Sequence, residues 1–134
     1  MIAVLDTSAA VRVVLNPEQS GAFRRQLAGA ELILAPELVV AELANTFWKY
    51  FRAGVLSRTA SEEGFRGALE LVDEFAPMQP LSIEALDLAI LTRRPAYDMF
   101  YLVLARRNGA ILLTGDESMR ESARNLGIST AGLG

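Results

Sequence analysis

The stretch Met1–Asp6, MIAVLD, decides the fold class because it places an acid directly after a short, uninterrupted apolar run. A run without polar alternation is typical of a strand buried on both faces of a sheet. Leu32–Ala35 (LILA) and Ala110–Thr114 (AILLT) repeat this pattern, with helix-like segments between them. Strands that alternate with helices indicate a parallel sheet covered on both faces. We therefore predict an α/β fold, a three-layer α/β/α sandwich with about five parallel strands and about seven helices.

Proline, glycine and capping residues delimit the other elements. Two further short strands are predicted at Met78–Leu81 and Ile128–Ala131. The predicted helices cover Ala9–Leu15, a segment after Asn16-Pro17, Glu37–Ala53, a segment opened by a capping box at Thr59-x-x-Glu62 and ending near Phe75, a segment capped by Ser82 and running to about Arg93, Tyr97–Asn108, and Glu117–Leu126. No linker or internal repeat interrupts this pattern, so residues 1–134 are expected to form one domain.

The composition excludes several kinds of chemistry. The 134 residues include no cysteine and no histidine, which excludes thiol catalysis, zinc fingers and the Ser-His-Asp triad. A catalyst built from this chain must use carboxylates, hydroxyls, arginines, the lone Lys49 or an ion that these groups hold. No apolar run is long enough to span a bilayer and no signal-peptide pattern is present, so we expect a cytoplasmic protein without a membrane anchor.

Four acidic residues fall at positions where the predicted elements meet. Asp6 follows the first strand directly, and Asp116 lies two residues beyond the strand that ends at Thr114. Asp98 lies in the first turn of a predicted helix, and Glu42 lies early in a helix that follows a strand. Because the carboxyl ends of parallel strands meet at one edge of a sheet, we expect these four acids to gather there.

Each acid also has a simpler interpretation. An Asp at a helix start is a preferred N-cap, and Ser118-x-x-Glu121 is a rival capping box that would free Asp116 from that task. Asp73 and Asp87 are interpreted as charges on helix surfaces. As a group, however, four carboxylates in one pocket repel one another strongly, and a divalent cation removes that cost. Oxygen ligands without His or Cys select hard ions such as Mg²⁺ or Mn²⁺.

Four short motifs occur in order along the chain. They are Asp6-Thr7-Ser8, Glu42 followed by Asn45, Tyr97-Asp98-x-x-Tyr101-Leu102-x-x-Ala105, and Leu113-Thr114-Gly115-Asp116. With these motifs the sequence resembles the PIN domain, and more narrowly the VapC-type toxin ribonucleases of bacterial toxin–antitoxin pairs. The resemblance covers essentially the whole chain.

The resemblance implies the strand order 3-2-1-4-5 and a metal-dependent endoribonuclease that binds one or two Mg²⁺ or Mn²⁺ ions. The implied catalytic acids and metal ligands are Asp6, Glu42, Asp98 and Asp116. The implied supporting polar groups toward the substrate are Thr7, Ser8 and Thr114. Glu117 and Ser118 follow Asp116 where many relatives have a further acid, which puts a second metal ion in doubt. The resemblance also implies a homodimer and a small antitoxin that occupies the site.

The chemistry of a metal site predicts the products. A carboxylate-held metal lowers the pKa of its water, so water rather than the ribose 2′-hydroxyl attacks and leaves 5′-phosphate and 3′-hydroxyl ends. The formal charge of −3 disfavours nonspecific binding to RNA, but arginines near the acids can compensate locally. Arg93 and Arg94 lie just before Asp98 and are the best-placed candidates to bind the substrate, although each is equally interpreted as an ordinary surface arginine.

The aromatic residues of the Glu37–Ala53 helix predict a partner surface. Phe47, Trp48, Tyr50 and Phe51 span most of the helix circumference, so they cannot all face one core. Some of them are therefore expected to contact another chain.

Two rival functions fit the acidic residues less well. A receiver-like phospho-acceptor domain needs a lysine at a strand end, whereas Lys49 lies inside a predicted helix. A dehalogenase-type phosphatase needs a second Asp where Ser8 stands. A noncatalytic domain whose acids bind a basic partner is the alternative from a different class.

Overall fold

The computed structural model describes residues 1–131, and the last three residues of the predicted domain lie outside the described part. Its centre is one parallel sheet with strand order β3-β2-β1-β4-β5, which confirms the predicted fold class and the implied order. The strands are β1 (Ile2–Leu5), β2 (Leu32–Pro36), β3 (Glu74–Ala76), β4 (Ile111–Leu113) and β5 (Thr130–Ala131). In register, Val4 of β1 lies between Leu34 of β2 and Leu112 of β4. All three side chains are buried, which explains the apolar runs.

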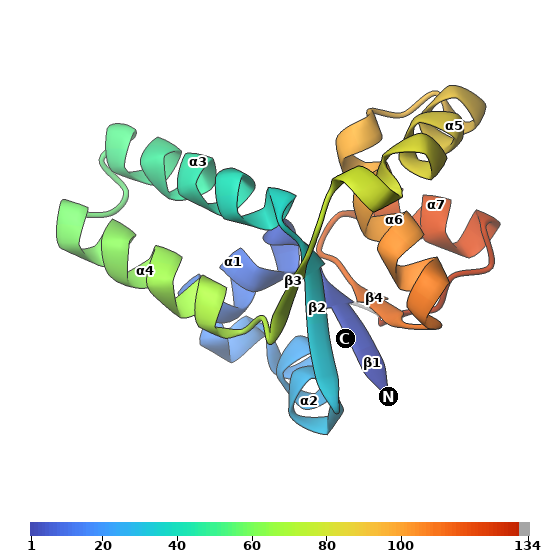
Figure 1. Ribbon diagram of the computed structural model, residues 1–134. Coiled ribbons are helices and arrows are strands. Elements are labelled where there is room, and N and C mark those ends of the chain that lie inside the picture. Colours follow the sequence, from blue (N-terminus) through green and yellow to red (C-terminus); the bar gives the residue numbers. More distant parts are fainter. Residues whose placement is uncertain (132–134) are drawn as a thin grey trace.

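Seven α-helices in residues 1–131 cover the sheet. They are α1 (Thr7–Leu15), α2 (Gly21–Gly29), α3 (Leu38–Arg52), α4 (Arg58–Glu70), α5 (Ser82–Thr92), α6 (Ala96–Asn108) and α7 (Glu117–Asn125), with short 3₁₀ helices at Pro17–Gln19 and Gln79–Leu81. Helices α1–α4 lie on one side of the sheet and α5–α7 on the other (Figure 1). This arrangement follows from right-handed connections between parallel strands, because the chain moves outward from β1 in both directions. The three-layer prediction is confirmed.

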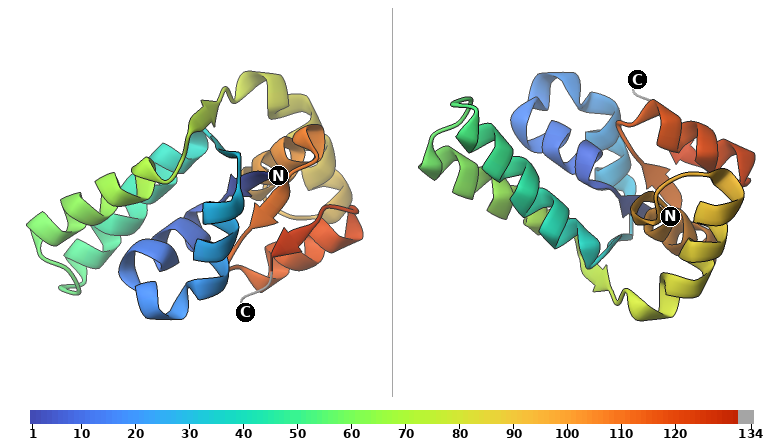
Figure 2. Two further views of the ribbon diagram at one scale, coloured as in Figure 1. Left: turned by 90° about the horizontal axis from the view of Figure 1, so that it is seen from below. Right: turned by 90° about the horizontal axis from the view of Figure 1, so that it is seen from above.

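Helices α3 and α4 pack against each other as a hairpin that extends beyond the sheet (Figures 1 and 2). Helix α6 is the most buried helix: Met99 and Leu102 to Ala105 are inaccessible or nearly so, and the helix packs on β1, β2 and β4. This placement brings the first turn of α6, which holds Asp98, close to the carboxyl ends of the central strands. None of the helices in residues 1–131 combines the length and the apolar character needed to cross a membrane.

Two predictions about the middle of the chain were wrong. The third strand is Glu74–Ala76 rather than Met78–Leu81, because Glu74–Ala76 pairs with β2, whereas Pro80 lies in a 3₁₀ turn. Proline has no N–H to give to a sheet, so the segment that contains it does not extend the ladder. Consequently α4 ends at Glu70 instead of near Phe75.

Three side chains have other tasks than predicted. Ser57, not the expected capping box at Thr59, caps α4 by accepting a hydrogen bond from the Ala60 N–H. Ser82 is the first residue of α5, and its hydroxyl donates to the Gln79 carbonyl instead of capping the helix. Asp73 is not a helix-surface charge, because its carboxylate accepts the Ile33 N–H of β2 at 2.8 Å. It therefore helps to hold the start of β3 beside β2.

Candidate active site at the carboxyl edge of the sheet

Asp6 leaves β1 at the centre of the sheet and points into the protein. It caps α1, as the simpler interpretation of this residue proposed, because its Oδ1 accepts hydrogen bonds from the Ala9 N–H and from the Ser8 hydroxyl. Its Oδ2 accepts a 2.5 Å hydrogen bond from the Thr114 hydroxyl. The residue is only 3% exposed. Burial raises the pKa of Asp6 to about 6, although these hydrogen bonds oppose the shift.

Thr114 and Ser8 join the ends of β1 and β4. Thr114 is fully buried, and its Oγ1 also accepts the N–H of Asp116. The Ser8 hydroxyl accepts the Gly115 N–H at 2.8 Å while donating to Asp6. Arg12 lies close to the same turn, 3.3 Å from where a Cβ on Gly115 would be. The hydroxyls predicted as supporting groups therefore fix the turn between β4 and α7 against Asp6.

Asp116 caps α7, so the prediction that Ser118-x-x-Glu121 would free it was wrong. Its Oδ1 accepts the Ser118 N–H and hydroxyl and the Met119 N–H. Burial acts to raise the pKa of Asp116, but the hydrogen bonds and the nearby charge of Arg94 outweigh burial and hold this pKa below its ordinary value. Asp116 therefore remains ionised at neutral pH.

Asp98 lies in the first turn of α6 and is half-buried. Its carboxylate forms an ion pair with Arg94, with 3.3 Å between Nη2 and Oδ2. Burial raises the pKa of Asp98, Arg94 acts in the opposite direction, and the negative charge of Asp116 adds to the rise. Arg94 also donates to the Ser118 hydroxyl, which donates to Asp116, so one guanidinium group connects the surroundings of the two acids.

Glu42 reaches the site from α3 on the other side of the sheet. Its Oε1 accepts hydrogen bonds from the Tyr101 hydroxyl at 2.5 Å and from the Thr7 hydroxyl at 3.0 Å. Burial and the charge of Glu42 both raise the pKa of Tyr101, so the phenol stays protonated as a donor. In residues 1–131 no hydrogen bond reaches the second oxygen of Glu42, which leaves that oxygen able to bind a ligand.

The four predicted acids thus lie at the same edge of the sheet. Asp6 and Asp98 each interact electrostatically with Asp116, and both Glu42 and Asp6 act on Tyr101. No three acidic side chains within residues 1–131, however, form a ready-made group of metal ligands. Hydroxyl groups and the guanidinium of Arg94 lie among them instead.

The sequence offers Tyr101 only as part of a motif, and Arg12 and Arg120 only as two of several arginines that could attract RNA phosphates. Tyr101 follows Asp98 by three residues, which places both on one face of α6. Arg120 is buried, and its Nη2 donates to the Thr114 carbonyl at 2.7 Å while Nη1 bonds to Glu117. Arg12 lies against the turn at Gly115.

Arg93, predicted to bind substrate, is exposed beside the site, whereas Arg94 turns into it.

The donor set fits a hard divalent cation. Every candidate ligand is a carboxylate or hydroxyl oxygen, which suits Mg²⁺ and Mn²⁺. The carboxylate of Asp6 is buried and accepts three hydrogen bonds, all from neutral groups: two hydroxyls and one backbone N–H. A buried charge without a positive partner is costly, and an adjacent divalent cation removes that cost. The residues present therefore fit such an ion.

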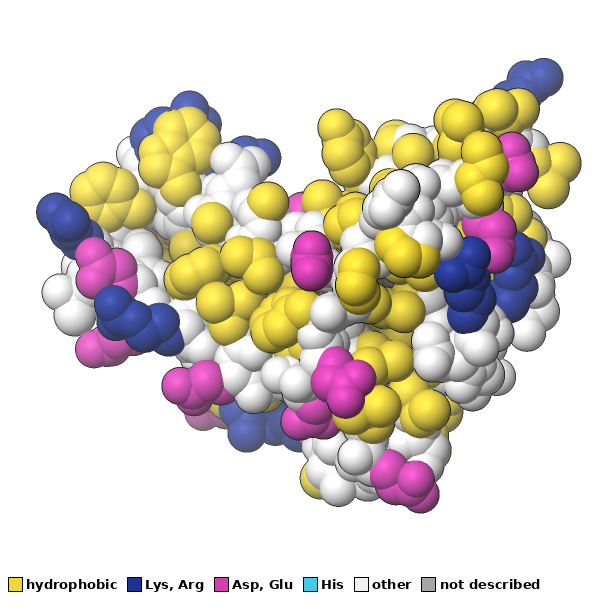
Figure 3. Space-filling model, in the orientation of Figure 1, with side chains coloured by type: hydrophobic (Ala, Val, Ile, Leu, Met, Phe, Trp, Pro, Cys, Tyr) yellow, Lys and Arg dark blue, Asp and Glu magenta, His cyan; other side chains and the backbone are white. Residues whose placement is uncertain are grey.

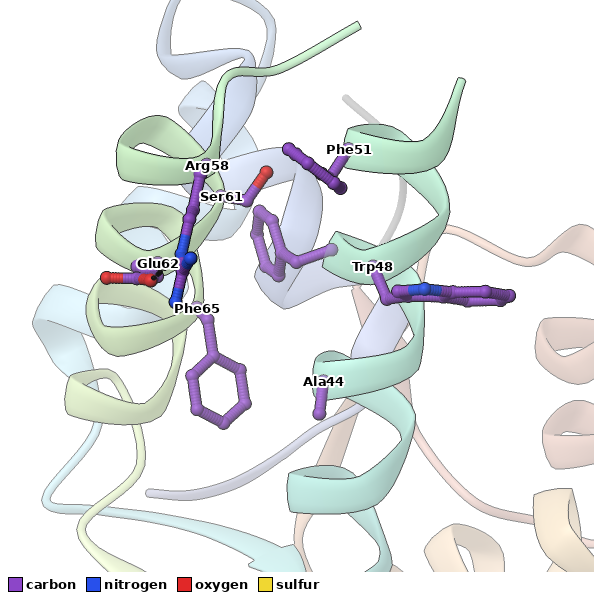
Figure 4. Close-up of a pocket in the computed structure, with 8 residues that line it drawn as sticks. Ala44, Trp48, Phe51, Arg58, Ser61, Glu62 and Phe65 are labelled. Carbon is purple, nitrogen blue, oxygen red and sulfur yellow. Dashed lines mark hydrogen bonds and ion pairs between the residues drawn. The ribbon is translucent and has the colours of Figure 1, made fainter. Parts of the chain in front are cut away.

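A separate apolar groove lies between α3 and α4. It has a volume of about 350 Å³ and is lined by Ala44, Phe47, Trp48, Phe51, Arg58, Ser61, Glu62 and Phe65. Phe51 points from α3 toward α4 and the Phe65 ring lies in the space between the two helices, whereas Trp48 projects away from α4 (Figure 4). Arg58 and Glu62 form an ion pair at the rim.

The aromatic residues of α3 divide as the helix geometry requires. Phe47 is buried, Tyr50 is half-buried, and Trp48 and Phe51 are about half exposed. A second exposed apolar face lies on α5, formed by Ile83, Leu86, Ile90 and Leu91. Figure 3, in the orientation of Figure 1, shows hydrophobic side chains gathered over the α3–α4 hairpin and over α5.

The fold and the site define a class, a three-layer α/β domain that collects four acids at the carboxyl edge of its sheet. The family model described as PIN domain matches residues 3–125. The chain therefore belongs to the PIN domain family, which confirms the family inferred from the four motifs.

Individual relatives agree with this assignment. Ribonuclease VapC3 of Pyrobaculum aerophilum is 29% identical over 123 residues, which are 88% of this chain and 92% of the relative. The crystal structure of PAE2754 from Pyrobaculum aerophilum matches with a TM-score of 0.76 and 20% identity, covering 97% of this chain and 83% of that one. VapBC2 from Rickettsia felis, bound to a DNA fragment from its promoter, matches with a TM-score of 0.68 and 16% identity over 97% of each chain.

Proposed function

We propose that this chain is a Mg²⁺- or Mn²⁺-dependent ribonuclease that hydrolyses RNA phosphodiester bonds, and that it is the toxin of a toxin–antitoxin pair. The observation that carries the proposal is Asp6, a buried carboxylate with neutral hydrogen-bond donors at the edge where three further acids gather. A divalent cation resolves the cost of this arrangement. The relationship to the ribonuclease VapC3 supports RNA as the substrate.

The metal ligands in this proposal are Asp6, Glu42, Asp98 and Asp116. When bound, Mg²⁺ or Mn²⁺ supplies a more acidic water and neutralises charge that develops on the phosphate. Thr114 holds the Asp6 carboxylate, and Tyr101 and Thr7 hold Oε1 of Glu42, which leaves its other oxygen without a hydrogen bond in residues 1–131. Arg120 fixes the end of β4 through the Thr114 carbonyl. These contacts preorganise the acids, so that they need little rearrangement during the reaction.

Arginines beside the pocket supply the attraction for RNA in this proposal. Arg93 is exposed and directly precedes Arg94, which contacts Asp98, so we propose that Arg93 binds a phosphate of the RNA. Arginine binds phosphate through two parallel hydrogen bonds, which suits a substrate that must approach an acidic pocket. The hydroxyls of Thr7 and Ser8 lie at the same edge and complete the proposed substrate contacts.

The direct test incubates purified, partner-free protein with cellular RNA, with Mg²⁺ and with EDTA, and maps the cut ends. We expect cleavage that needs the metal, leaves 5′-phosphate and 3′-hydroxyl ends, and is lost in Asp6→Asn. Cleavage that survives EDTA and leaves 2′,3′-cyclic phosphate ends would contradict the mechanism. A folded Asp6→Asn protein, verified by circular dichroism, separates loss of activity from loss of structure.

Two apolar surfaces support the proposed protein partners. The groove between α3 and α4 offers apolar side chains with a charged rim, and it is where we propose that an antitoxin binds. Structural neighbours whose names are VapBC and FitAB support a partner of this kind. Ile83, Leu86 and Ile90 lie on one exposed stripe of α5, and we propose this stripe as the homodimer surface.

One observation favours a second function, the noncatalytic binding of a basic partner. The ion pair between Arg94 and Asp98 shows that the acidic edge accommodates a guanidinium group. A protein of this kind would bind a basic peptide equally well in EDTA and would leave RNA intact. The cleavage experiment above therefore decides between the two functions. A receiver-like function loses its support, because Lys49 lies in α3 and not at a strand end.

A further inference from the structure

The guanidinium group of Arg94 occupies a position between two of the four acids. We propose that Arg94 is a built-in counter-ion of the acidic site, and that a divalent cation must displace it from Asp98 in order to bind. The inference rests on the proposed metal-dependent function and adds a residue that weakens metal affinity. It assigns Arg94 a task different from that of its neighbour Arg93.

The contacts of a single nitrogen atom carry this inference. Nη2 of Arg94 lies 3.3 Å from Oδ2 of Asp98 and donates to the Ser118 hydroxyl at 2.9 Å. That hydroxyl in turn donates to Oδ1 of Asp116 at 2.7 Å. The guanidinium therefore connects the first turn of α6 to the first turn of α7, between two carboxylates that also repel each other. A divalent cation bound by Asp98 and Asp116 would therefore compete with the Arg94 guanidinium for the same space and for the same negative charge.

The side chain is held there mainly by charge. Arg94 is only 23% exposed, and its Nε atom is buried without a hydrogen-bond acceptor in residues 1–131. A buried donor without an acceptor is unfavourable, so this position is not optimised for hydrogen bonding. The attraction between the Arg94 guanidinium and the carboxylates of Asp98 and Asp116 compensates for the missing hydrogen bond of Nε. A doubly positive ion that satisfies the two acids removes the reason for Arg94 to remain between them.

The backbone directs the two arginines to different places. Helix α5 ends at Thr92, and Arg93 adopts a left-handed conformation with φ of 58°. Pro95 then fixes the entry into α6. This turn leaves Arg93 exposed and sends the Arg94 side chain across the start of α6 toward Asp98. Arg93 and Arg94 therefore carry equal charges at adjacent positions, but in residues 1–131 only Arg94 forms an ion pair with an acid of the site.

The test compares Mn²⁺ binding by calorimetry, without RNA, for the wild type, Arg94→Gln and Arg93→Gln. Both variants lose one positive charge close to the site, so Arg93→Gln controls for the general change in electrostatic potential. We expect Arg94→Gln to bind Mn²⁺ about three- to fivefold more tightly than Arg93→Gln, because the partly buried ion pair with Asp98 no longer competes. Arg94→Met, which keeps the aliphatic stem, should show the same gain if Arg94→Gln folds poorly.

The outcomes separate this inference from the proposed function. Equal or weaker Mn²⁺ binding by Arg94→Gln and Arg94→Met than by Arg93→Gln overturns the counter-ion role while the metal-dependent function stands. If the two Arg94 variants lose RNA affinity at unchanged Mn²⁺ affinity, Arg94 is a substrate contact and the inference is overturned. An absence of Mn²⁺ binding by all proteins, wild type included, overturns the inference and the proposed metal dependence together.

Discussion

The hydroxyl of Thr114 donates a 2.5 Å hydrogen bond to the carboxylate of Asp6, across 108 residues of sequence. Thr114 also accepts the N–H of Asp116, so one buried hydroxyl connects two of the candidate metal ligands. Its position at the end of β4 makes this possible, because β1 and β4 are paired side by side and end at the same edge. The candidate site therefore depends on sheet register as well as on the acids themselves.

Thr114→Val should weaken the site and lower stability. Valine keeps the β-branched shape but cannot donate to Asp6 or accept from Asp116, which leaves Oδ2 of Asp6 and the backbone N–H of Asp116 without a partner. Each such loss costs about 1–3 kcal/mol, so the two together should lower the free energy of unfolding by about 2–6 kcal/mol. Urea denaturation measures the change. Thr59→Val, at an exposed position of α4, provides the control and should change stability by less than about 0.5 kcal/mol.

The raised pKa of Asp6 predicts how stability depends on pH. Burial raises this pKa from 3.8 to about 6 in the folded protein, against the opposing hydrogen bonds. The folded state therefore binds the proton more tightly than the unfolded state does, so the contribution is present below pH 3.8 and is lost as pH rises through 6. In metal-free buffer, Asp6 should lower the free energy of unfolding by about 2 kcal/mol between pH 4 and pH 7, because the contribution is not yet complete at pH 4.

Asp6→Asn isolates this contribution. Urea denaturation of both proteins in EDTA from pH 4 to pH 7 should show the wild type losing stability relative to Asp6→Asn, since Asn does not ionise. Other acids, such as Asp98 with its raised pKa, affect both proteins alike and cancel in the difference. Parallel stability curves would show that Asp6 ionises without a penalty. Mg²⁺ at pH 7 should then stabilise the wild type more than the variant, by mass action.

Tyr101→Phe should impair metal binding while leaving the fold intact. The phenol is buried and gives Glu42 the shorter of its two hydrogen bonds, so its removal frees the Glu42 side chain to move. We expect weaker Mg²⁺ binding, by about fivefold, which corresponds to about 1 kcal/mol. Calorimetry measures the affinity directly. Tyr97→Phe, at an exposed position one turn earlier in α6, makes the same change without this contact and should bind Mg²⁺ like the wild type.

The strand pattern predicts the edge of the sheet at which the acids lie, because the carboxyl ends of parallel strands share one edge. The catalytic and metal-binding roles of Asp6, Glu42, Asp98 and Asp116 stay predictions. The sequence does not reveal the partners that hold these acids. Tyr101 meets Glu42 across 59 residues and Arg94 meets Ser118 across 24, and such contacts depend on three-dimensional packing. The third strand was misplaced for a related reason. Glu74–Ala76 is largely exposed and lacks an apolar run, so only its pairing with β2 identifies it as a strand.

Gly64→Ala should disturb the α3–α4 hairpin and its groove. A Cβ at residue 64 would lie 2.5 Å from Cε1 of Phe47, whose ring is buried and cannot swing away. Overpacking of this kind costs about 1–3 kcal/mol, so the free energy of unfolding should fall by that amount. Phe47 also lines the groove, so binding of an antitoxin there should weaken as well.

Gly67→Ala is the matched control on the same helix. A Cβ at residue 67 would only touch Val14 at 3.9 Å, which is ordinary van der Waals contact. Because alanine is a better helix former than glycine, this variant should gain about 0.5–1 kcal/mol in the same denaturation experiment. Both substitutions replace glycine with alanine in the same helix. If the free energy of unfolding falls in Gly64→Ala and rises in Gly67→Ala, the loss at residue 64 is due to the ring of Phe47. Equal gains in both variants would show that α3 and α4 separate easily, and that the groove is too pliable to select a partner by shape.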